Sequence, residues 1–297
     1  MGCCGSRSWA KLPEECTGVQ RAALLRWLRG GGGPPGPPCY FEELGKLDLR
    51  EHFVYVTGIR GSNSEEESER EEEVFDTKAF GAFVTEVLPR LTNVTEMSLR
   101  GNLLCGRQPN VKLDKLALAM KTGSLPRCMT LDLSSNGLGL GTPAETTSVL
   151  ESVLPRSLVC LNLSDNPLHL FTSDGWRTVA NVAPQLQCLT LANAQLYRMD
   201  ANGWEVLGTT LELFPALVEL DLSANGLSGS EEMIARSVLP RLPRLEVLGF
   251  SRNNIGLNPR IGMSGTKNSE RQRRCELQSK HVAVLQAAAP IKCRLRF

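Results

Sequence analysis

The sequence predicts an α/β solenoid, in which a curved parallel sheet carries helices on its outer face. Three observations carry this prediction. The pattern LxxLxLxxNxL recurs six times in one register between residues 94 and 255, and consecutive copies begin 28 to 34 residues apart. Proline also follows four of the segments that separate the copies, each of which has the apolar spacing of a helix. A repeat found in the chain is the first thing to interpret, because it decides the whole fold.

Each copy contains a short strand followed by a turn. The two leucines of LxL alternate with polar residues, so they point to one face of a strand. The asparagine then turns inward, where its amide satisfies backbone groups that the bend leaves open. A single unit cannot bury its own apolar face, so neighbouring units must stack. The copies begin at Val94, Cys128, Leu158, Leu186, Leu217 and Leu245.

The fourth copy departs from the pattern, because Ala194 stands where asparagine is expected. We expect a locally altered turn there, with Asn193 displaced by one position. The other copies keep their asparagine, at Asn102, Asn136, Asn166, Asn225 and Asn253.

The segments between the strands are long enough for full helices. Proline commonly follows the end of a helix, and Pro155, Pro184, Pro215 and Pro240 each follow such a segment. The expected helices are Ser148–Leu154, Trp176–Val182, Trp204–Phe214 and Glu231–Leu239.

These repeats resemble the ribonuclease-inhibitor-like class of leucine-rich repeats, which also includes the Ran GTPase activators. The resemblance covers roughly residues 94–255. It implies a leucine-rich-repeat solenoid and a role in protein binding, although one fold of this kind serves many partners. The Ran activators act through residues on repeat loops, and no such loop residue can be matched in this sequence.

The flanks divide the chain further. Residues 1–39 hold the N-terminus, a short amphipathic helix within Val19–Arg29 and the linker GGGGPPGPP, and residues 40–93 form a cap or degenerate repeat with an acidic insert at 62–73. The repeats then occupy 94–268, and a cap helix over 269–289 with a closing strand fills 269–297. In the degenerate repeat the template falls on Leu44, Leu47, Leu49, His52 and Val54.

Composition excludes several classes of function. The net charge is +1, which gives no overall field to attract nucleic acid. The ten cysteines and three histidines form no metal-ligand cluster, and no Walker or HExxH motif or Ser-His-Asp spacing is present. Residues 137–141 read GLGLG without the spacing of a dinucleotide loop. We therefore expect a non-enzymatic protein with no cofactor, no metal, no nucleic acid and no small-molecule substrate.

The N-terminus predicts lipidation. Gly2 and Ser6 fit the myristoylation pattern, and Cys3 and Cys4 lie beside them, where palmitoylation commonly follows. One myristoyl chain binds membranes only weakly, so a second lipid is needed for stable residence. With no apolar run of transmembrane length, we expect the cytoplasmic face of a membrane together with a cytoplasmic pool. The alternative is an unmodified N-terminal tail.

The strand residues that point away from the core form the concave face. Its candidate binding residues are Glu96, Arg100, Asp132, Asn162, Cys160, Cys188, Glu219 and Asp221. Most residues of this face are small and polar, and Leu-Asp-Leu-Ser is close to the consensus sequence of the repeat. A generic solvated face and a specific binding surface therefore both remain open.

Two further features carry chemistry. Cys160 and Cys188 share one row in adjacent repeats, so their thiols should lie close together. A redox or metal role is one interpretation; two reduced surface thiols are the other, and a cytosolic compartment favours the latter. The acidic run Glu65–Glu73 is expected to be a mobile, solvated insert in which Ser64 and Ser68 are candidate phosphorylation sites.

Three functions follow from these features. The first is a membrane-tethered scaffold that binds a protein partner through the repeat surface. The second, implied by the resemblance, is regulation of a small GTPase. The third is a ubiquitin-ligase substrate adaptor, because Leu12–Glu15 before an apolar helix resembles the start of an F-box; too few residues precede the linker for that domain.

Overall fold

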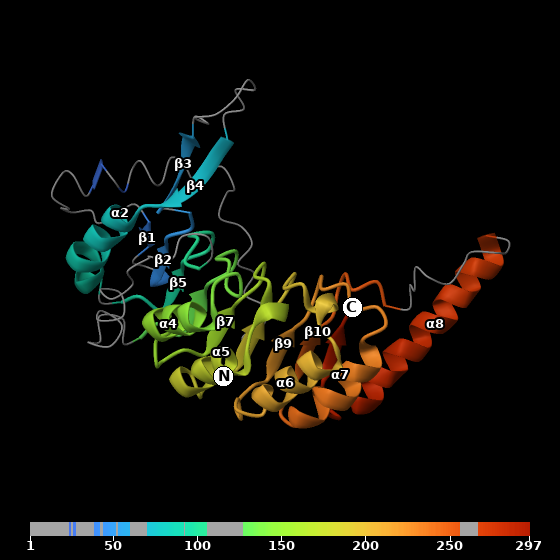
Figure 1. The fold of residues 1–297 in the computed structure, drawn as a ribbon. Helices are drawn as coiled ribbons and strands as arrows, with labels where there is room; N and C mark the ends of the chain where they lie inside the picture. The colour runs from blue at the N-terminus through green and yellow to red at the C-terminus, as the bar shows by residue number, and fades with distance from the viewer. Residues whose placement is uncertain are drawn as a thin grey trace, which may run out of the picture. The chain divides into compact units, whose positions relative to one another are not determined.

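The computed structural model describes Leu24, Arg26 and Trp27 and residues 39–41, 44–51, 53–59, 70–91, 93–105, 127–255 and 267–297. The chain forms two compact units, Met1–Leu158 and Val159–Phe297, and each is described by itself. Both have the leucine-rich-repeat architecture that the sequence predicts: short strands in register, joined by segments that carry helices (Figure 1).

The sheet of the N-terminal unit runs in the order β1 (Tyr40–Phe41), β2 (Lys46–Asp48), β5 (Glu96–Ser98) and β6 (Thr130–Asp132). β1 is antiparallel to β2, and the remaining pairs are parallel. Three helical segments follow each other in α2 (Thr77–Ala82), a π-helical turn (Phe83–Val87) and a 3-10 turn (Leu88–Arg90). Thr142 is the N-cap residue of α4 (Pro143–Val153) and forms a capping box with Glu145.

The degenerate first repeat is present in its strand and differs from the template at both ends. Leu47 and Leu49 are buried and align with the next repeat, as predicted. Leu44 is 69% exposed, because it precedes the turn at Gly45 rather than joining the strand. Val54 begins the separate strand β3 instead of closing the repeat. Phe53 fills the core in its place, and its N–H donates to Oδ1 of Asn102 at 3.1 Å.

A β-hairpin occupies part of the region expected to be an acidic insert. β3 (Val54–Ile59) pairs antiparallel with β4 (Arg70–Phe75), with Val54 opposite Phe75 and Ile59 opposite Arg70. The expectation of a mobile insert is therefore wrong for residues 70–73, because ladder hydrogen bonds use backbone groups and hold a glutamate-rich strand when a partner strand is available. Ser64, Ser68 and the rest of the run up to residue 69 lie outside the described residues.

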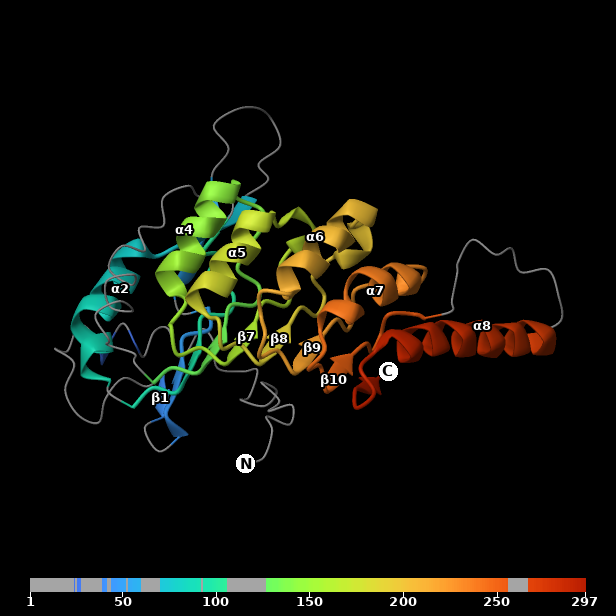
Figure 2. The same ribbon diagram turned by 90° about the horizontal axis from the view of Figure 1, so that it is seen from below.

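The C-terminal unit is a parallel sheet of β7 (Cys160–Asn162), β8 (Cys188–Thr190), β9 (Glu219–Asp221), β10 (Val247–Gly249) and β11 (Arg294–Arg296). Its helices are α5 (Ser173–Val182), α6 (Ala201–Leu211), α7 (Glu231–Ser237) and α8 (Lys267–Ala288). Figure 2 shows α5, α6 and α7 side by side along the strands. The 3-10 turns Leu168–Leu170, Leu196–Arg198 and Leu239–Arg241 lie in the connections.

Helices lie where the prolines predicted them, with shifts of a few residues at the ends. α8 and β11 also lie close to the residues expected for a cap helix and a closing strand. Leu285 of α8 is fully buried, and Phe297 packs edge-on against Phe250 of the sixth repeat with ring centroids 6.5 Å apart. β11 pairs in parallel with β10 and so continues the sheet beyond the last repeat.

Inward-pointing leucines and asparagines form the core of both units. The leucines at the LxL positions are no more than 2% exposed. The asparagines form hydrogen bonds along the stack: Asn225, for example, donates from Nδ2 to the carbonyl oxygen of Leu191 at 2.7 Å, and its Oδ1 accepts from the N–H of Ala194 at 2.7 Å. Asn102, Asn136, Asn225 and Asn253 each link the backbone of their own repeat to that of the preceding one in this way.

The turn at Ala194 is not altered, so that expectation is wrong. Ala194 occupies the asparagine position and is fully buried. Asn193 has φ 51°, close to the 56° of Ser135 and the 58° of Ala224, which precede the asparagine in other repeats. The turn geometry is thus set by the left-handed residue before the asparagine position. Alanine loses the amide hydrogen bonds but keeps the bend, and Asn193 donates instead to Asp165 Oδ1 at 2.8 Å.

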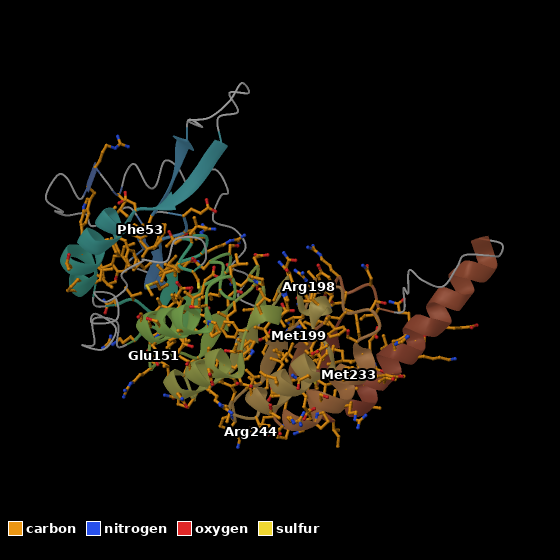
Figure 3. All side chains as sticks on the ribbon, in the orientation of Figure 1. Phe53, Glu151, Arg198, Met199, Met233 and Arg244 are labelled. Carbon is orange, nitrogen blue, oxygen red and sulfur yellow. The ribbon has the colours of Figure 1, made fainter. Side chains whose placement is uncertain are left out.

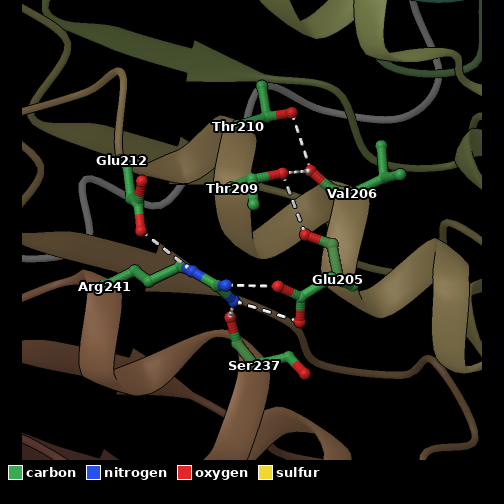
Figure 4. Close-up of polar contacts among 7 residues, drawn as sticks. All are labelled: Glu205, Val206, Thr209, Thr210, Glu212, Ser237 and Arg241. Carbon is green, nitrogen blue, oxygen red and sulfur yellow. Dashed lines mark hydrogen bonds and ion pairs between the residues drawn. The ribbon is translucent and has the colours of Figure 1, made fainter.

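The junction between α6 and α7 combines a close approach with ion pairs (Figure 4). A Cβ atom added at Gly208 would lie 1.9 Å from the carbonyl oxygen of Ser237, so only glycine fits there. Arg241 donates to that same carbonyl, to both carboxylate oxygens of Glu205 and, at 2.9 Å, to Glu212 Oε1. The arginine lowers the pKa of Glu205, which is exposed, so the cluster mainly fixes the geometry of the junction.

Candidate functional site

Polar residues on the concave face of the N-terminal unit bind mainly one another. The Arg50 guanidinium donates two hydrogen bonds to the Asp48 carboxylate, from Nε to Oδ1 at 2.9 Å and from Nη2 to Oδ2 at 2.8 Å. Ser98 donates to Asp132 Oδ2 at 3.2 Å, and Asp132 is 2% exposed, so burial raises the pKa of its carboxyl group. Glu96 is half-buried and Arg100 is exposed. Of the predicted binding residues in this unit, Arg100 is therefore the one most accessible to a partner.

A recurring backbone role accounts for three of the predicted concave residues. Asp132, Asn162 and Asp221 each accept a hydrogen bond from the N–H group two residues further on, at 3.0 Å, 3.0 Å and 2.9 Å. This is the local bond that short Asp and Asn side chains commonly make in turns. Their side chains stabilise the end of each strand, which explains why the repeat prefers these residues and reduces what they can offer a partner.

The concave face of the C-terminal unit carries a different row. Cys160, Cys188 and Glu219 occupy equivalent positions on adjacent strands, and all three are half-buried. Arg296 on β11 donates to Glu219 Oε1 at 3.4 Å. Burial raises the pKa of Glu219, and Arg296 partly offsets this effect. The prediction that the two cysteines share a row is confirmed by their register, since Cys160 pairs directly with Cys188.

Two exposed large side chains, Leu170 and Tyr197, lie on the loops at the carboxyl ends of β7 and β8. We call this surface the rim patch: half-buried His169 and exposed Leu170 in the turn after β7, and exposed Tyr197 and Arg198 in the turn after β8. Figure 3 labels Arg198 on this surface. Leu170 is 51% exposed and Tyr197 is 60% exposed.

The rim patch is held by rigid local structure. Both of its turns are 3-10 segments that contact each other, and each begins with a buried leucine. Tyr197 lies beside Gly226 of the next repeat, whose added Cβ atom would come 3.6 Å from the tyrosine Cβ. His169 Nδ1 is buried, and desolvation together with Arg198 lowers the pKa of the histidine. The side chains of the patch therefore stand on a fixed frame.

Sequence reasoning missed the rim patch because it followed only the strand positions. The sequence signal that could have found it is the size of the side chain one or two residues after the last buried leucine of each repeat. There the chain has large side chains at Leu170 and Tyr197, whereas the fifth repeat has Ser228 and Gly229. In the N-terminal unit Leu140, two residues after buried Leu138, is likewise 62% exposed.

A shallow groove of about 770 Å³ lies at the amino-end edge of the strands of the C-terminal unit. Ile291, which is fully exposed, stands in its wall. The remaining lining residues are Val218, Leu239, Pro240, Pro243, Arg244, Leu245, Glu246, Ala288, Ala289, Pro290 and Lys292.

The remaining predicted sites lie outside the described residues, namely Gly2, Cys3, Cys4, Ser64 and Ser68. Across the part of the chain that the structure describes, no helix has both the length and the apolar character needed to cross a membrane. Within the same residues, no group of three or more His, Cys, Asp or Glu side chains is arranged to hold a metal ion.

The repeats and their geometry define the fold, which is that of a leucine-rich-repeat solenoid. Comparison with solved structures finds the leucine-rich repeat-containing protein LegL7 from Legionella pneumophila at 20% identity and a TM-score of 0.48, covering 74% of this chain and 68% of that one. It also finds the tropomodulin C-terminal domain of Caenorhabditis elegans at 11% identity and a TM-score of 0.33, covering 59% and 96%. No family description matches the sequence, and no curated protein matches it. Folds of this class typically serve as interaction scaffolds.

Proposed function

We propose that the protein is a lipid-anchored scaffold that binds a protein partner through the rim patch of its C-terminal unit. The observation that carries this proposal is the exposure of Leu170 and Tyr197 next to Arg198 on two packed turns. Tyrosine and arginine are enriched among the residues that dominate protein interfaces. Exposed apolar side chains that cluster on a rigid frame mark binding surfaces more often than isolated ones do.

The chemistry of the patch describes its partner. Leu170 and the ring of Tyr197 offer apolar area, and the Arg198 guanidinium offers donors that suit a carboxylate. Asp165, in the turn after β7, already accepts a hydrogen bond from Asn193. We therefore expect a partner surface with an apolar side chain beside an acidic one.

Proximity labelling from this chain in its native cell tests the scaffold. The test variant is Leu170→Ser with Tyr197→Ala, and the matched control is Leu213→Ser, which changes a leucine that is 44% exposed at the end of α6. We expect a discrete set of labelled proteins to disappear in the test variant and to persist in the control. An identical set in both variants would remove the rim patch from the proposal.

The same preparation separates the scaffold from regulation of a small GTPase, which the resemblance implies. Purified chain is mixed with small GTPases loaded with GTP or GDP, and binding and GTP hydrolysis are both measured. If the wild-type chain accelerates GTP hydrolysis and the rim variant does not, the protein would be a GTPase regulator and not only a scaffold. Under that reading the patch would be the surface that engages the GTPase.

Lipid anchoring rests on the first six residues, Met-Gly-Cys-Cys-Gly-Ser. Gly2 must carry the first lipid, because myristate joins only an N-terminal glycine exposed by removal of Met1. Cys3 and Cys4 then supply thiols for a second lipid, without which membrane binding is weak and reversible.

Fractionation of three forms tests the anchor. The wild type should pellet with membranes, the Cys3→Ser/Cys4→Ser form should divide between fractions, and Gly2→Ala should remain in the supernatant. If Gly2→Ala still pellets, the anchor is wrong while the rim patch is unaffected, since the two parts of the proposal depend on different residues.

A further inference from the structure

The in-register cysteines of β7 and β8 form a second feature that protein binding does not use. Cys160 and Cys188 are direct partners in the parallel ladder, and neither is in a disulfide. Each begins its strand and precedes a buried leucine, Leu161 or Leu189, so both thiols point to the opposite, concave face. Both residues are half-buried.

Backbone hydrogen bonds on both sides fix the spacing of the pair. The N–H groups of Gln187 and Cys188 donate to the Val159 carbonyl at 2.8 Å and 3.0 Å, and Leu163 N–H donates to the Thr190 carbonyl at 2.9 Å. Neighbouring strands lie about 4.8 Å apart, so two in-register cysteines with the same χ1 rotamer have their sulfur atoms at a similar separation.

That separation decides between the chemistries open to two thiols. In a disulfide the Cα atoms usually lie about 4.4–6.8 Å apart and the Cβ atoms about 3.5–4.5 Å apart; in-register strands meet the first range but exceed the second slightly, so a disulfide would require a small shift of the two strands. A metal–thiolate bond is about 2.3 Å, so two such bonds in line span about 4.6 Å, which matches the strand spacing. A tetrahedral zinc site would need two more ligands, and no group of three metal-binding side chains exists among the described residues.

We propose that Cys160 and Cys188 form a two-coordinate site for a soft monovalent cation, Cu(I), on the concave face. Soft thiolates select Cu(I) over harder ions. Binding converts two thiols and one Cu(I) into a bis-thiolate complex of charge −1 and releases two protons. Glu219 is the acidic neighbour of Cys188 in the row, and its ion pair with Arg296 reduces the repulsion that the anionic complex would meet.

The test uses full-length chain carrying Cys3→Ser and Cys4→Ser, which removes the N-terminal thiols as competing ligands. Cu(I) is delivered under reducing, oxygen-free conditions as its bicinchoninate complex, and transfer to the protein is followed by the loss of colour. We expect one Cu(I) per chain. Cys160→Ser and Cys188→Ser should each weaken binding about a hundredfold or more, whereas Cys293→Ser, at a half-buried cysteine before β11, should leave it unchanged.

A second measurement needs no substitution at the pair. Cu(I) should protect Cys160 and Cys188 from iodoacetamide, as read by mass spectrometry of the two peptides. Cys39 and Cys128 give little background, because burial raises the pKa of each thiol to about 12. X-ray absorption should show two sulfur ligands.

Four results would overturn the site: retained Cu(I) affinity in both single variants, unprotected thiols, tighter binding of Zn(II) than of Cu(I), or a Cys160–Cys188 disulfide as the stable form under the same conditions. None of these bears on the rim patch, so this inference and the proposed function stand or fall separately.

Discussion

The buried asparagine at the centre of the C-terminal unit is the most informative single residue to change. Asn225 is 1% exposed. Its Oδ1 accepts from the N–H groups of Ala194 at 2.7 Å and Leu196 at 3.3 Å, and its Nδ2 donates to the Leu191 carbonyl at 2.7 Å and the Leu222 carbonyl at 3.0 Å. Its Nδ2 also donates to the Ser223 carbonyl at 3.1 Å, and Asn225→Ala removes all five bonds.

The size of the effect follows from which groups lose a partner. The Leu222 carbonyl keeps the hydrogen bond from Asn253 Nδ2 at 2.9 Å, so it still has a partner. The Ala194 N–H and the Leu191 carbonyl lose their short bonds to the amide, and the Leu196 N–H loses a longer one of 3.3 Å. Leaving a buried backbone group unsatisfied costs about 1–3 kcal/mol. We therefore expect Asn225→Ala to lower the free energy of unfolding by about 2–6 kcal/mol.

Urea unfolding followed by circular dichroism measures the loss, and hydrogen exchange locates it. The matched control is Asn202→Ala, at an exposed position in α6, which should change stability by less than about 0.5 kcal/mol. The Ala194 amide should exchange faster in Asn225→Ala and unchanged in the control. A loss under about 1 kcal/mol, or an unaltered Ala194 amide, would refute the view that the asparagines hold neighbouring repeats together.

Three further outcomes are expected. Leu161→Ala should cost about 2–5 kcal/mol in urea unfolding, because the side chain is fully enclosed, whereas exposed Leu213→Ala should cost far less; equal losses would contradict the assigned core. Burial raises the pKa of Asp132 above its ordinary 3.8, so the unfolded chain ionises first and this residue lowers stability as the pH rises through that window. Asp132→Asn should then gain stability relative to wild type between pH 3 and pH 7, and a difference that does not change with pH would refute it. Gly208→Ala should destabilise by about 1–3 kcal/mol despite the better helix propensity of alanine, since its Cβ would meet the Ser237 carbonyl; a higher melting temperature would show that the helices move apart easily.

The fold was predictable because periodic burial leaves a periodic record in the sequence. Leucines two residues apart can share a face only in a strand, and prolines limit the segments that can be helical. The same logic failed where a residue's environment came from a distant segment. β1 pairs with β2 through two residues that carry no repeat pattern, and the strand Arg70–Phe75 pairs with Val54–Ile59, which precedes it by more than ten residues.

Ala194 shows how the sequence can mislead about a turn. The missing asparagine suggested a different bend, yet the backbone follows the other repeats. The bend depends on the left-handed residue at 193, and asparagine tolerates that conformation better than most side chains do. What the substitution removes is hydrogen bonding, and Asn225 of the next repeat still bonds the Ala194 N–H. Local geometry and the satisfaction of polar groups are thus encoded by different residues of the repeat.

The concave face was the least predictable part, for a reason that also indicates where to look for function. Asp132, Asn162 and Asp221 are polar and lie on the expected face, but each is occupied by the backbone N–H two residues further on. Asp or Asn holds this strand position in three of the six repeats and bonds the backbone in each, so its recurrence reflects the backbone and not a ligand. Residues that the backbone does not require are better candidates for binding. In the C-terminal unit these are the cysteine pair on β7 and β8 and the large side chains of Leu170 and Tyr197. The fifth repeat has the small residues Ser228 and Gly229 at the corresponding positions.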